Sequence, residues 1–572
     1  MKLALATWLA LAAGASAFQG TTTRVSVSTG GAEGDETSWF PSISANGRVV
    51  AFTSRASNLV SGDWNSRDDT FVHDRQTGTT ERVSVSTSGA EGNDTSGQPS
   101  ISADGRFVSF WSYASNLVVG TTNGSAQVFL RDRQSGTTEI VSVSPAGAEG
   151  NFNSGTSSIS SDGRFVAFHS GASNFVAGDT NWAPDVFVRD RQNGTIERAS
   201  VATGGAEGNG GSLEPAVSAD GRFVAFTSGA SNLVAGDTNS HWDIFVRDRQ
   251  SGTTERASVA TGGAEGNSNS TYGWISADGR FVAFTSSASN LVAGDTNGMY
   301  DVLVRDRQND TTERASVDSA GAQGNLHSDA YSISADGRFV AFTSGASNLV
   351  AGDTNSRLDI FVRDRQSGTT ERVSVSTSGV EGDSYCQTSS ISSDGRFVAF
   401  NSASSNLVAG DANGLVDIFV RDRGLLPPTV YCTSGTTSNG CTASIAASAN
   451  PNVAHSTPCQ ITISNVEGQR TGIVFYALSP LSQSWCSAGG GTSFVCVKAP
   501  TQRTFAQNSG GTQGRCDGSL ALDWDAFQLA NPLALGAPWI AGAKAYVQGW
   551  FRDPPSCKTT SLSNAVELTY QP

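Results

Sequence analysis

Ser218-Ala-Asp-Gly-Arg-Phe-Val-Ala-Phe-Thr-Ser228 begins a motif that continues, after a loop, with Asp243-Ile-Phe-Val-Arg-Asp-Arg249 and Thr253-Thr-Glu-Arg-Ala-Ser-Val259. The motif occurs seven times, and its turn glycine recurs every 58 residues, at Gly47, Gly105, Gly163, Gly221, Gly279, Gly337 and Gly395. No insertion or deletion interrupts this spacing. A fixed period of this length indicates a repeat architecture.

Each repeat contains four short runs that are typical of β-strands, here called runs a to d. Between runs a and b lies an Asp-Gly pair (Asn-Gly in the first repeat), which predicts a hairpin with a type I′ turn and positive φ at both central residues. Run b, Phe223–Phe226 in the fourth repeat, is apolar on both faces and therefore indicates a strand between two layers. Four-stranded units that stack face to face around a ring form a β-propeller.

The two ends of the repeat array predict that the ring is closed. The array starts with a lone d run, Arg24–Ser28, and the seventh repeat stops after run c, at Arg423. If the first d run completes the last unit, no long strand edge stays unpaired. The sequence therefore predicts an all-β fold, a seven-bladed β-propeller closed by its N-terminal strand.

The phrases Ser-Ala-Asp-Gly-Arg-Phe-Val-Ala-Phe and Asp-Ile-Phe-Val-Arg-Asp resemble the repeat of TolB-type propellers, which are relatives of the WD repeat. The resemblance covers roughly residues 22–423. It implies a propeller fold and a general role in binding other macromolecules. It implies no functional residues, because the matching motif is the scaffold itself.

The first 17 residues, Met1–Ala17, have the pattern of a signal peptide: Lys2, an apolar run too short to span a bilayer, and the small-residue cleavage site Ala15-Ser-Ala17. No other long apolar run occurs, so we expect an exported protein, periplasmic or extracellular, without a membrane span. The net charge of −15 argues against nucleic acid as a partner, because nucleic-acid binding requires a basic surface.

Two connections of each repeat vary in sequence, the b–c loop and the d–a connection. In a propeller blade both lie on one rim, and loops held by a rigid scaffold often carry binding residues. Exposed aromatic residues usually indicate contact with a partner, although drift in unconstrained loops is the alternative. The predicted ligand-binding residues are Trp39, Trp64, Trp182, Trp242, Trp274 and Tyr300.

The b–c loop also carries an Asp-x-Asn-x-x-x-Asp pattern, for example Asp237, Asn239 and Asp243. Clustered oxygen ligands suit Ca²⁺. The glutamate that completes an EF-hand loop is absent, however, and Asp and Asn commonly cap turns. We favour turn capping and therefore predict no cofactor. Bound Ca²⁺ is the alternative.

Signals for catalysis are few. The five histidines share no position in the repeat, and neither a Gly-x-Ser-x-Gly elbow nor a His-Glu-x-x-His helix occurs. The repeated Arg-Asp-Arg of run c suits a structural ion-pair network. We therefore predict a non-enzymatic binding or scaffold protein whose partner is a protein or a glycan. A secreted hydrolase or lyase acting on glycans or peptides is the alternative, and an asymmetric cluster of titratable groups near the axis would favour it.

The pattern ends after residue 424. The propeller is assigned to residues 18–424, a proline-containing linker to 425–429, and a second, β-sandwich-like domain to 430–572. Apolar alternation predicts strands at Gln460–Ser464, Gly472–Tyr476 and Ala545–Trp550, and Leu520–Asn531 is a candidate helix. The second domain is similar to a C-terminal module of many exported bacterial proteins.

Eight cysteines in an exported chain suggest disulfides. The module resemblance includes four of them, and we pair neighbours in sequence, Cys432 with Cys441 and Cys496 with Cys516. Cys459 and Cys557 lie beside predicted strands and are expected to join the ends of a sheet. Because the number of cysteines is even, the remaining two, Cys386 and Cys486, could pair with each other. They are expected to lie too far apart for a disulfide, however, which favours two free thiols.

Overall fold

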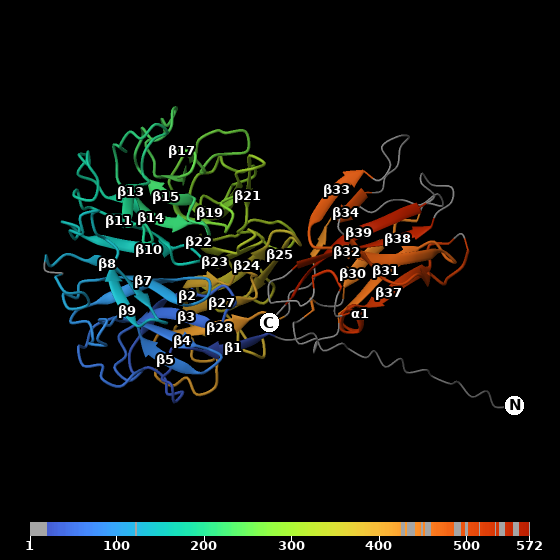
Figure 1. Ribbon diagram of the computed structural model, residues 1–572, viewed down its shortest axis with the longest axis horizontal. Helices are drawn as coiled ribbons and strands as arrows, with labels where there is room; N and C mark the ends of the chain where they lie inside the picture. The colour runs from blue at the N-terminus through green and yellow to red at the C-terminus, as the bar shows by residue number, and fades with distance from the viewer. Residues whose placement is uncertain are drawn as a thin grey trace. The chain divides into compact units, whose positions relative to one another are not determined.

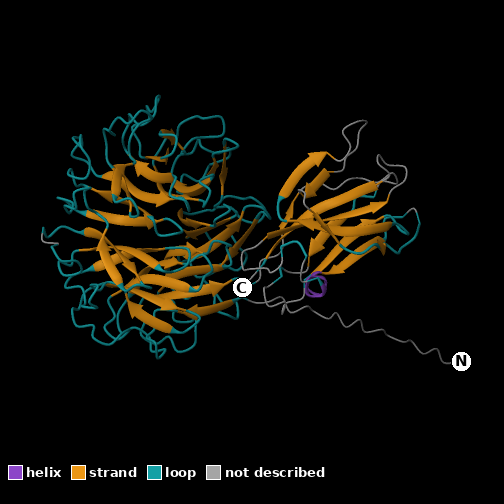
Figure 2. Ribbon diagram, in the orientation of Figure 1, coloured by secondary structure: helices purple, strands orange, loops and turns teal. Residues whose placement is uncertain are grey.

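The computed structural model describes residues 20–120, 123–424, 429–431, 441–447, 450–451, 459–484, 494–497, 501–513, 515–531, 534–536, 544–552 and 560–570. The predicted signal peptide lies outside these residues. The chain divides into two compact units, Met1–Gly424 and Leu425–Pro572. Strands dominate both units (Figure 2). Among the described residues, no helix has the length and apolar character needed to cross a bilayer.

The first unit contains seven antiparallel sheets of four strands, numbered here in chain order (Figure 1). Sheets 1 to 3 are β2 (Ser38–Ile43), β3 (Val49–Ser54), β4 (Asp69–Asp74), β5 (Thr79–Arg82); β6 (Ser96–Ile101), β7 (Phe107–Ser112), β8 (Gln127–Asp132), β9 (Thr137–Ile140); and β10 (Ser154–Ile159), β11 (Phe165–Ser170), β12 (Asp185–Asp190), β13 (Thr195–Arg198). Sheets 4 to 6 are β14 (Ser212–Val217), β15 (Phe223–Ser228), β16 (Asp243–Asp248), β17 (Thr253–Arg256); β18 (Ser270–Ile275), β19 (Phe281–Ser286), β20 (Asp301–Asp306), β21 (Thr311–Arg314); and β22 (Ser328–Ile333), β23 (Phe339–Ser344), β24 (Asp359–Asp364), β25 (Thr369–Arg372).

Sheet 7 combines the two ends of the repeat array. Its strands are β26 (Cys386–Ile391), β27 (Phe397–Ser402), β28 (Asp417–Asp422) and β1 (Thr21–Arg24), and β1 pairs with β28 (Figure 1). The N-terminal strand thus supplies the missing fourth strand. It covers Thr21–Arg24 rather than the predicted Arg24–Ser28, because beyond Arg24 the Ser26 hydroxyl turns onto Asp417 and donates to its carboxylate at 2.5 Å.

Backbone hydrogen bonds connect the seven sheets in a closed cycle. The turn after each first strand donates to the equivalent turn of the next sheet, from Ala45 N to Ala103 O (3.0 Å) onward. The seventh turn closes the cycle, because Ser393 N donates to Ala45 O, also at 3.0 Å. Sheet 7 therefore meets sheet 1 through the same contact that joins the other neighbours.

The turn between the first two strands differs from the predicted type I′ geometry. Within this turn of sheet 4 only Gly221 has positive φ (+75°), and Gly221 N donates to Ser218 O at 2.9 Å. The Asp220 carboxylate accepts hydrogen bonds from the Ser218 hydroxyl and from Arg222 N. Because this side chain caps the turn, its own backbone stays in the ordinary region and one left-handed residue is enough.

The motif glycine is also the point at which neighbouring sheets touch. A Cβ atom built on Gly163 would lie 2.2 Å from the Phe107 ring of the preceding sheet. The guanidinium groups of Arg106 and Arg191 lie over this ring, at 4.6 and 4.7 Å from its centroid. Arg191 also donates to Gly163 O at 2.5 Å, so glycine, arginine and phenylalanine form one contact.

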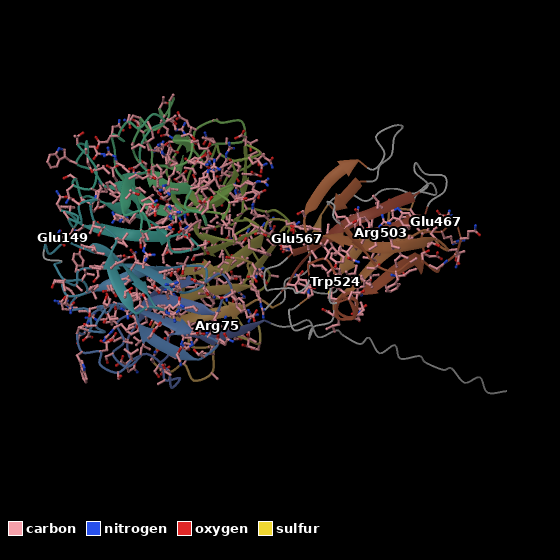
Figure 3. All side chains as sticks on the ribbon, viewed as in Figure 1. Arg75, Glu149, Glu467, Arg503, Trp524 and Glu567 are labelled. Carbon is pink, nitrogen blue, oxygen red and sulfur yellow. A yellow bond between two sulfur atoms is a disulfide. The ribbon has the colours of Figure 1, made fainter. Side chains whose placement is uncertain are left out.

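The same contact recurs around the ring. In the closing interface, Gly47 packs on Phe397 of sheet 7, and Arg75 lies 4.7 Å from the centroid of that ring; Figure 3 labels Arg75. The exception is the interface of sheets 1 and 2, where Gly105 packs on Val49. In six sheets the central aspartate of Arg-Asp-Arg pairs with the turn arginine, as Asp248 does with Arg222 (2.7 Å), and in sheet 1 Asp74 of His73-Asp74-Arg75 pairs with Arg48 (2.7 Å). The predicted structural ion-pair network is confirmed.

The second unit contains a three-stranded sheet, a larger sheet and a hairpin. The three-stranded sheet has the order β30 (Ser444–Ala447), β31 (Gln460–Val466), β37 (Gly518–Asp523). The larger sheet has the order β29 (Thr429–Tyr431), β39 (Thr560–Thr569), β38 (Lys544–Arg552), β32 (Thr471–Ala477), β35 (Thr501–Arg503), and β36 (Gln507–Asn508) also pairs with β32. The hairpin consists of β33 (Pro480–Ser484) and β34 (Phe494–Val497). Ile461 and Leu522 of the small sheet share one buried core with Val474, Val547 and Val566 of the larger one.

The candidate helix Leu520–Asn531 is only partly correct, because α1 covers Trp524–Ala530 (Figure 3 labels Trp524). Leu520 and Leu522 belong to β37, where buried and exposed residues alternate with the period of a strand. Asp523 caps the helix by accepting from Ala526 N at 2.9 Å.

The structure joins Cys441 to Cys516, so the predicted pairs Cys432–Cys441 and Cys496–Cys516 are wrong. Strands β30 and β37 both flank β31, and their first residues lie at the same end of it. This topology brings the two cysteines to a Cα–Cα distance of 5.3 Å, whereas proximity in sequence gave no information about it.

Cys459 and Cys386 are buried, free thiols, so the expected bridge from Cys459 to Cys557 does not form. Burial raises the pKa of both thiols to about 12. Cys432, Cys486 and Cys557, and the side chain of Cys496, lie outside the described part of the chain.

The contact between Gly221 and Phe165 gives a direct test of how the sheets are held together. Gly221→Ala places a methyl group 2.1 Å from the Phe165 ring, at a φ of +75°. Gly236→Ala is the matched control, because its φ is +79° and nothing lies within 4 Å. The left-handed backbone alone costs about 1–2 kcal/mol, and overpacking adds about 1–3 kcal/mol.

We therefore expect Gly221→Ala to lower the free energy of unfolding clearly more than Gly236→Ala in urea titrations of the whole chain. Equal losses for the two variants would contradict a role of the glycine in joining sheets.

Candidate functional site

The two variable connections of each repeat lie on one rim of the first unit, called here the loop rim. Ser57 N donates to Asp35 Oδ1 at 2.7 Å, and Asn65 Nδ2 donates to Gly92 O at 2.8 Å, so a b–c loop is bonded to d–a connections. The turns of the opposite rim are bonded to each other, as by Arg75 Nη1 to Gly47 O at 2.6 Å. This division into two rims agrees with the prediction.

The six aromatic residues proposed from the sequence do not come together at one site. Trp64 and Trp182, 85% and 97% exposed, lie in the loops of sheets 1 and 3. Trp242 is half-buried against Gly229, and the Tyr300 ring packs 5.1 Å from the His327 ring. The remaining two, Trp39 and Trp274, belong to strands rather than to loops and line two different cavities.

The first strands of all seven sheets line one cavity of about 350 Å³, the axial cavity. Consecutive first strands contact each other around it, including β2 with β26. Each of these strands carries an irregularity in its pairing, such as the one between Leu213 and Ala216. At four of the irregularities the first unpaired residue has positive φ: Phe40, Gln98, Glu214 and Tyr272. A bulge re-aims a side chain, and all four residues line the axial cavity.

One side of the axial cavity is lined by Glu214, Tyr272 and Tyr331 of sheets 4, 5 and 6, and Asp329 does not line it but acts on both tyrosines. Burial raises the pKa of Glu214 and of Asp329 above their ordinary values. Glu214 and burial raise the pKa of Tyr272, and burial together with Asp329 raises that of Tyr331. Glu214 Oε2 accepts hydrogen bonds from the Thr227 hydroxyl (3.1 Å) and from Tyr272 N (3.2 Å). The sequence analysis missed this cluster.

A second cavity, of about 420 Å³ and called here the side pocket, lies between sheets 1, 2 and 3. Its walls include Trp39, Phe40, Gln98, Trp111, Tyr113 and His169. Trp111 and His169 occupy a position at which Thr53, Thr227, Thr285 and Thr343 stand in other repeats. Aligning the seven repeats position by position would therefore have revealed this departure, which a search for loop aromatics overlooked.

The acids of the b–c loops surround an arginine. Arg82 Nη1 lies 3.3 Å from Asp63, 3.5 Å from Asp69 and 2.7 Å from Glu91. Equivalent clusters surround Arg24, Arg198, Arg256, Arg314 and Arg372, and the one at Arg256 contains the Ca²⁺ candidates Asp237 and Asp243.

The asparagine of the pattern is a turn cap, as predicted. Asn239 Oδ1 accepts from His241 N at 2.9 Å, while its amide nitrogen donates to Asp243. Asp63, Asp69 and Glu91 do lie close enough together to hold a cation, but the arginine already neutralises part of their charge.

The second repeat supports an arginine-centred network. Ile140 replaces the arginine, and in the same repeat Thr121 and Gln127 replace the two aspartates. Gln127 is satisfied without charge, because the Ser142 hydroxyl donates to it at 2.7 Å and it donates to Gly150 O at 2.9 Å. The arginine and the two aspartates are lost together, while Glu149 remains at the position of Glu91.

No family model matches this chain, and no curated protein matches it. Among solved structures, TolB from Acinetobacter baumannii is similar at 17% identity and a TM-score of 0.34, covering 57% of this chain and 63% of that one. A putative TolB from Agrobacterium tumefaciens is similar at 16% identity and a TM-score of 0.32, covering 49% of this chain and 80% of that one. The chain thus spans less than two thirds of the Acinetobacter TolB chain.

The acylaminoacyl peptidase of Pyrococcus horikoshii is also similar, at 10% identity and a TM-score of 0.40, covering 76% of this chain and 59% of that one.

The Arg82 cluster predicts how stability depends on pH. Burial, together with Asp69, raises the pKa of Asp63 to about 7. A carboxyl group whose pKa is higher in the folded chain than in the unfolded chain destabilises the fold when ionised. This cost is present above pH 7 and disappears as the pH falls toward 4, the ordinary pKa of aspartate.

Asp63→Asn mimics the protonated side chain, so we expect it to melt clearly higher than the wild type at pH 8, and this advantage should shrink as the pH falls toward 4. Asp68→Asn, which removes the same charge from the same loop, controls for net charge. An advantage that is as large at pH 4 as at pH 8 would contradict the assignment. Chelator should leave the melting temperature unchanged, and a fall that Ca²⁺ restores would instead identify a cation site.

Proposed function

We propose that residues 18–424 form a seven-bladed β-propeller closed by the N-terminal strand. It is followed by a linker (425–429) and a β-sandwich-like domain (430–572), in a protein exported to the periplasm or outside the cell. The closed cycle of backbone hydrogen bonds and the pairing of β1 with β28 support the propeller. The pattern of Met1–Ala17 and the bond between Cys441 and Cys516 support export, because disulfides persist in oxidising compartments.

We further propose that this propeller is a non-enzymatic binding protein whose partner, a protein or a glycan, docks on the loop rim and the entrance of the axial cavity. One observation carries this proposal. The contacts that join neighbouring sheets repeat almost unchanged, whereas the residues at the bulges differ in nearly every repeat: Phe40, Gln98, Thr156, Glu214, Tyr272, Ala330 and Thr388. A scaffold that repeats while its lining varies presents an asymmetric surface for recognition.

Alanine at Trp64, Trp182, Trp242 and Tyr300 tests the loop rim. Aromatic side chains at an interface often contribute more than about 1 kcal/mol each to binding. We expect the fourfold variant to lose a partner captured from the cell envelope, or to bind it at least tenfold more weakly. The control variant, Gln250→Ala with Thr253→Ala, changes exposed residues of the opposite rim and should bind as the wild type does. Loss of binding in the control alone would refute the proposal.

A hydrolase or lyase acting on glycans or peptides is the second candidate, and the axial cluster of Glu214, Tyr272, Asp329 and Tyr331 favours it. Groups with displaced pKa values in a cavity are typical of catalytic sites. Binding remains the first candidate because, in the described part of the chain, no hydrogen bond joins the side chains of any two of these four residues. A nucleophile with its base would be expected to show such a bond.

Glu214→Gln separates the two candidates, since it preserves the shape of the side chain and removes its acid–base function. If the chain is an enzyme, cleavage of glycan or peptide libraries by the wild type should fall at least a hundredfold in this variant. If it is a binding protein, neither form cleaves any library.

A further inference from the structure

The side pocket differs from the rest of the ring through two matched pairs of residues. Gly97 stands opposite Trp111 in the pairing of β6 with β7, and a Cβ atom on Gly97 would lie 3.5 Å from the indole ring. In sheet 3 a Cβ atom on Gly155 would lie 2.7 Å from His169 Nε2. The other five repeats carry a side chain at the glycine position: Trp39, Leu213, Thr271, Asp329 and Gln387. A large ring in the second strand thus occurs only where the first strand has glycine.

These replacements give up a hydrogen bond that the scaffold uses elsewhere. The Thr53 hydroxyl accepts from Gln98 N at 3.0 Å, and the Thr285 hydroxyl accepts from Ala330 N at 2.9 Å, each time joining one sheet to the bulge of the next. Trp111 and His169 stand at the threonine position and offer no such hydroxyl. A scaffold contact has been exchanged for aromatic walls around a cavity.

The walls of the side pocket are flat and aromatic. The Trp111 and Tyr113 rings meet edge to face at 5.8 Å, which fixes their planes relative to each other. Phe40 and Tyr113 are 41% and 42% exposed, so their rings are open to a ligand. The cavity volume of about 420 Å³ falls within the range of small-molecule sites, about 300–1,000 Å³.

The polar groups of the pocket select the chemistry of the ligand. Trp111 Nε1 and the Thr156 hydroxyl both donate to Gln98 Oε1, at 3.1 Å each. Within the described residues Gln98 Nε2 makes no hydrogen bond, so the amide offers donors. His169 Nδ1 is buried and lacks a partner in the same part of the chain. Burial lowers the pKa of His169 to about 4, so the ring is neutral at pH 7 and carries one donor and one acceptor.

A ligand for this pocket therefore needs flat apolar faces and uncharged groups that both accept and donate hydrogen bonds. An organic cation is disfavoured, because the acceptor of Gln98 is already occupied and donors remain. An anion is disfavoured as well, because neither lysine nor arginine is among the lining residues and Asp68 is. A pyranose ring meets the requirement, since its C–H faces suit the negative face of an aromatic ring and its hydroxyls donate and accept.

We propose that the side pocket binds a neutral sugar ring of an oligosaccharide, packed against the perpendicular rings of Trp111 and Tyr113 and hydrogen-bonded by Gln98 Nε2 and the His169 imidazole. This inference rests on the proposed binding function and narrows its ligand to a neutral glycan.

Calorimetric titration of the full chain with cellotetraose, mannotetraose, xylotetraose and chitotetraose tests the pocket. We expect at least one tetrasaccharide to bind and to change the tryptophan fluorescence. Trp111→Thr, His169→Thr and Gln98→Glu should each weaken that binding about tenfold or more, as expected for central contacts. Threonine is the residue of other repeats at the first two positions, so these variants should keep the fold, which their melting temperatures check.

Phe505→Ala is the control. It removes an aromatic ring of the second unit that is 61% exposed and does not line the side pocket, so it should leave tetrasaccharide affinity within about twofold. The inference is overturned if no tetrasaccharide binds at millimolar concentration, if Trp111→Thr binds as the wild type does, or if choline binds in place of the sugars.

These outcomes are separable from failure of the proposed function. A loop-rim variant that loses its envelope partner while the wild type ignores all four sugars would overturn the sugar site alone. If the fourfold loop-rim variant still captures the envelope partner as the wild type does, the proposed function is overturned instead, whether or not the sugars bind.

Discussion

The ring depends on one contact, in which the backbone of a turn glycine lies against a phenylalanine ring of the preceding sheet. Only glycine fits, because the space for a Cβ atom is filled by the ring and the φ of the turn is left-handed. Two arginines cover the faces of the same ring, each a cation–π contact worth about 1 kcal/mol. The contact occurs at six of seven interfaces, with Val49 replacing phenylalanine at the remaining one.

Because six of the seven motif glycines are committed to this contact, the rim that carries the turns has little freedom to vary. On the loop rim, hydrogen bonds take the place of this contact. The b–c loops are held mainly by hydrogen bonds to the adjoining connections, such as Asn65 to Gly92 O, and by the arginine clusters. Variation is therefore tolerated on the loop rim and on the bulged first strands, where it creates two different cavities.

The exact period made the repeat, its strands and the role of the N-terminal strand predictable, since hydrophobic pattern and turn residues act locally. The site was less predictable. Trp39 and Trp274 looked like loop residues, because a bulge and a positive φ nearby break the alternation that would have identified a strand. The bond from Cys441 to Cys516 was missed because it depends on which strands flank β31, and pairing order is a long-range property.

Repetition also explains how the chain accommodates departures that would be costly in a smaller fold. Sheet 2 lacks the arginine cluster and the threonine of its second strand, and it joins sheet 1 through Val49. Its remaining interface, with Gly163 and Arg191 on Phe107, and the other interfaces of the ring still hold it in place. Since stability in repeat proteins is close to a sum over neighbouring contacts, a local loss stays local. The sheet with the weakest scaffold contacts is thus the one that gains Trp111, Tyr113 and the side pocket.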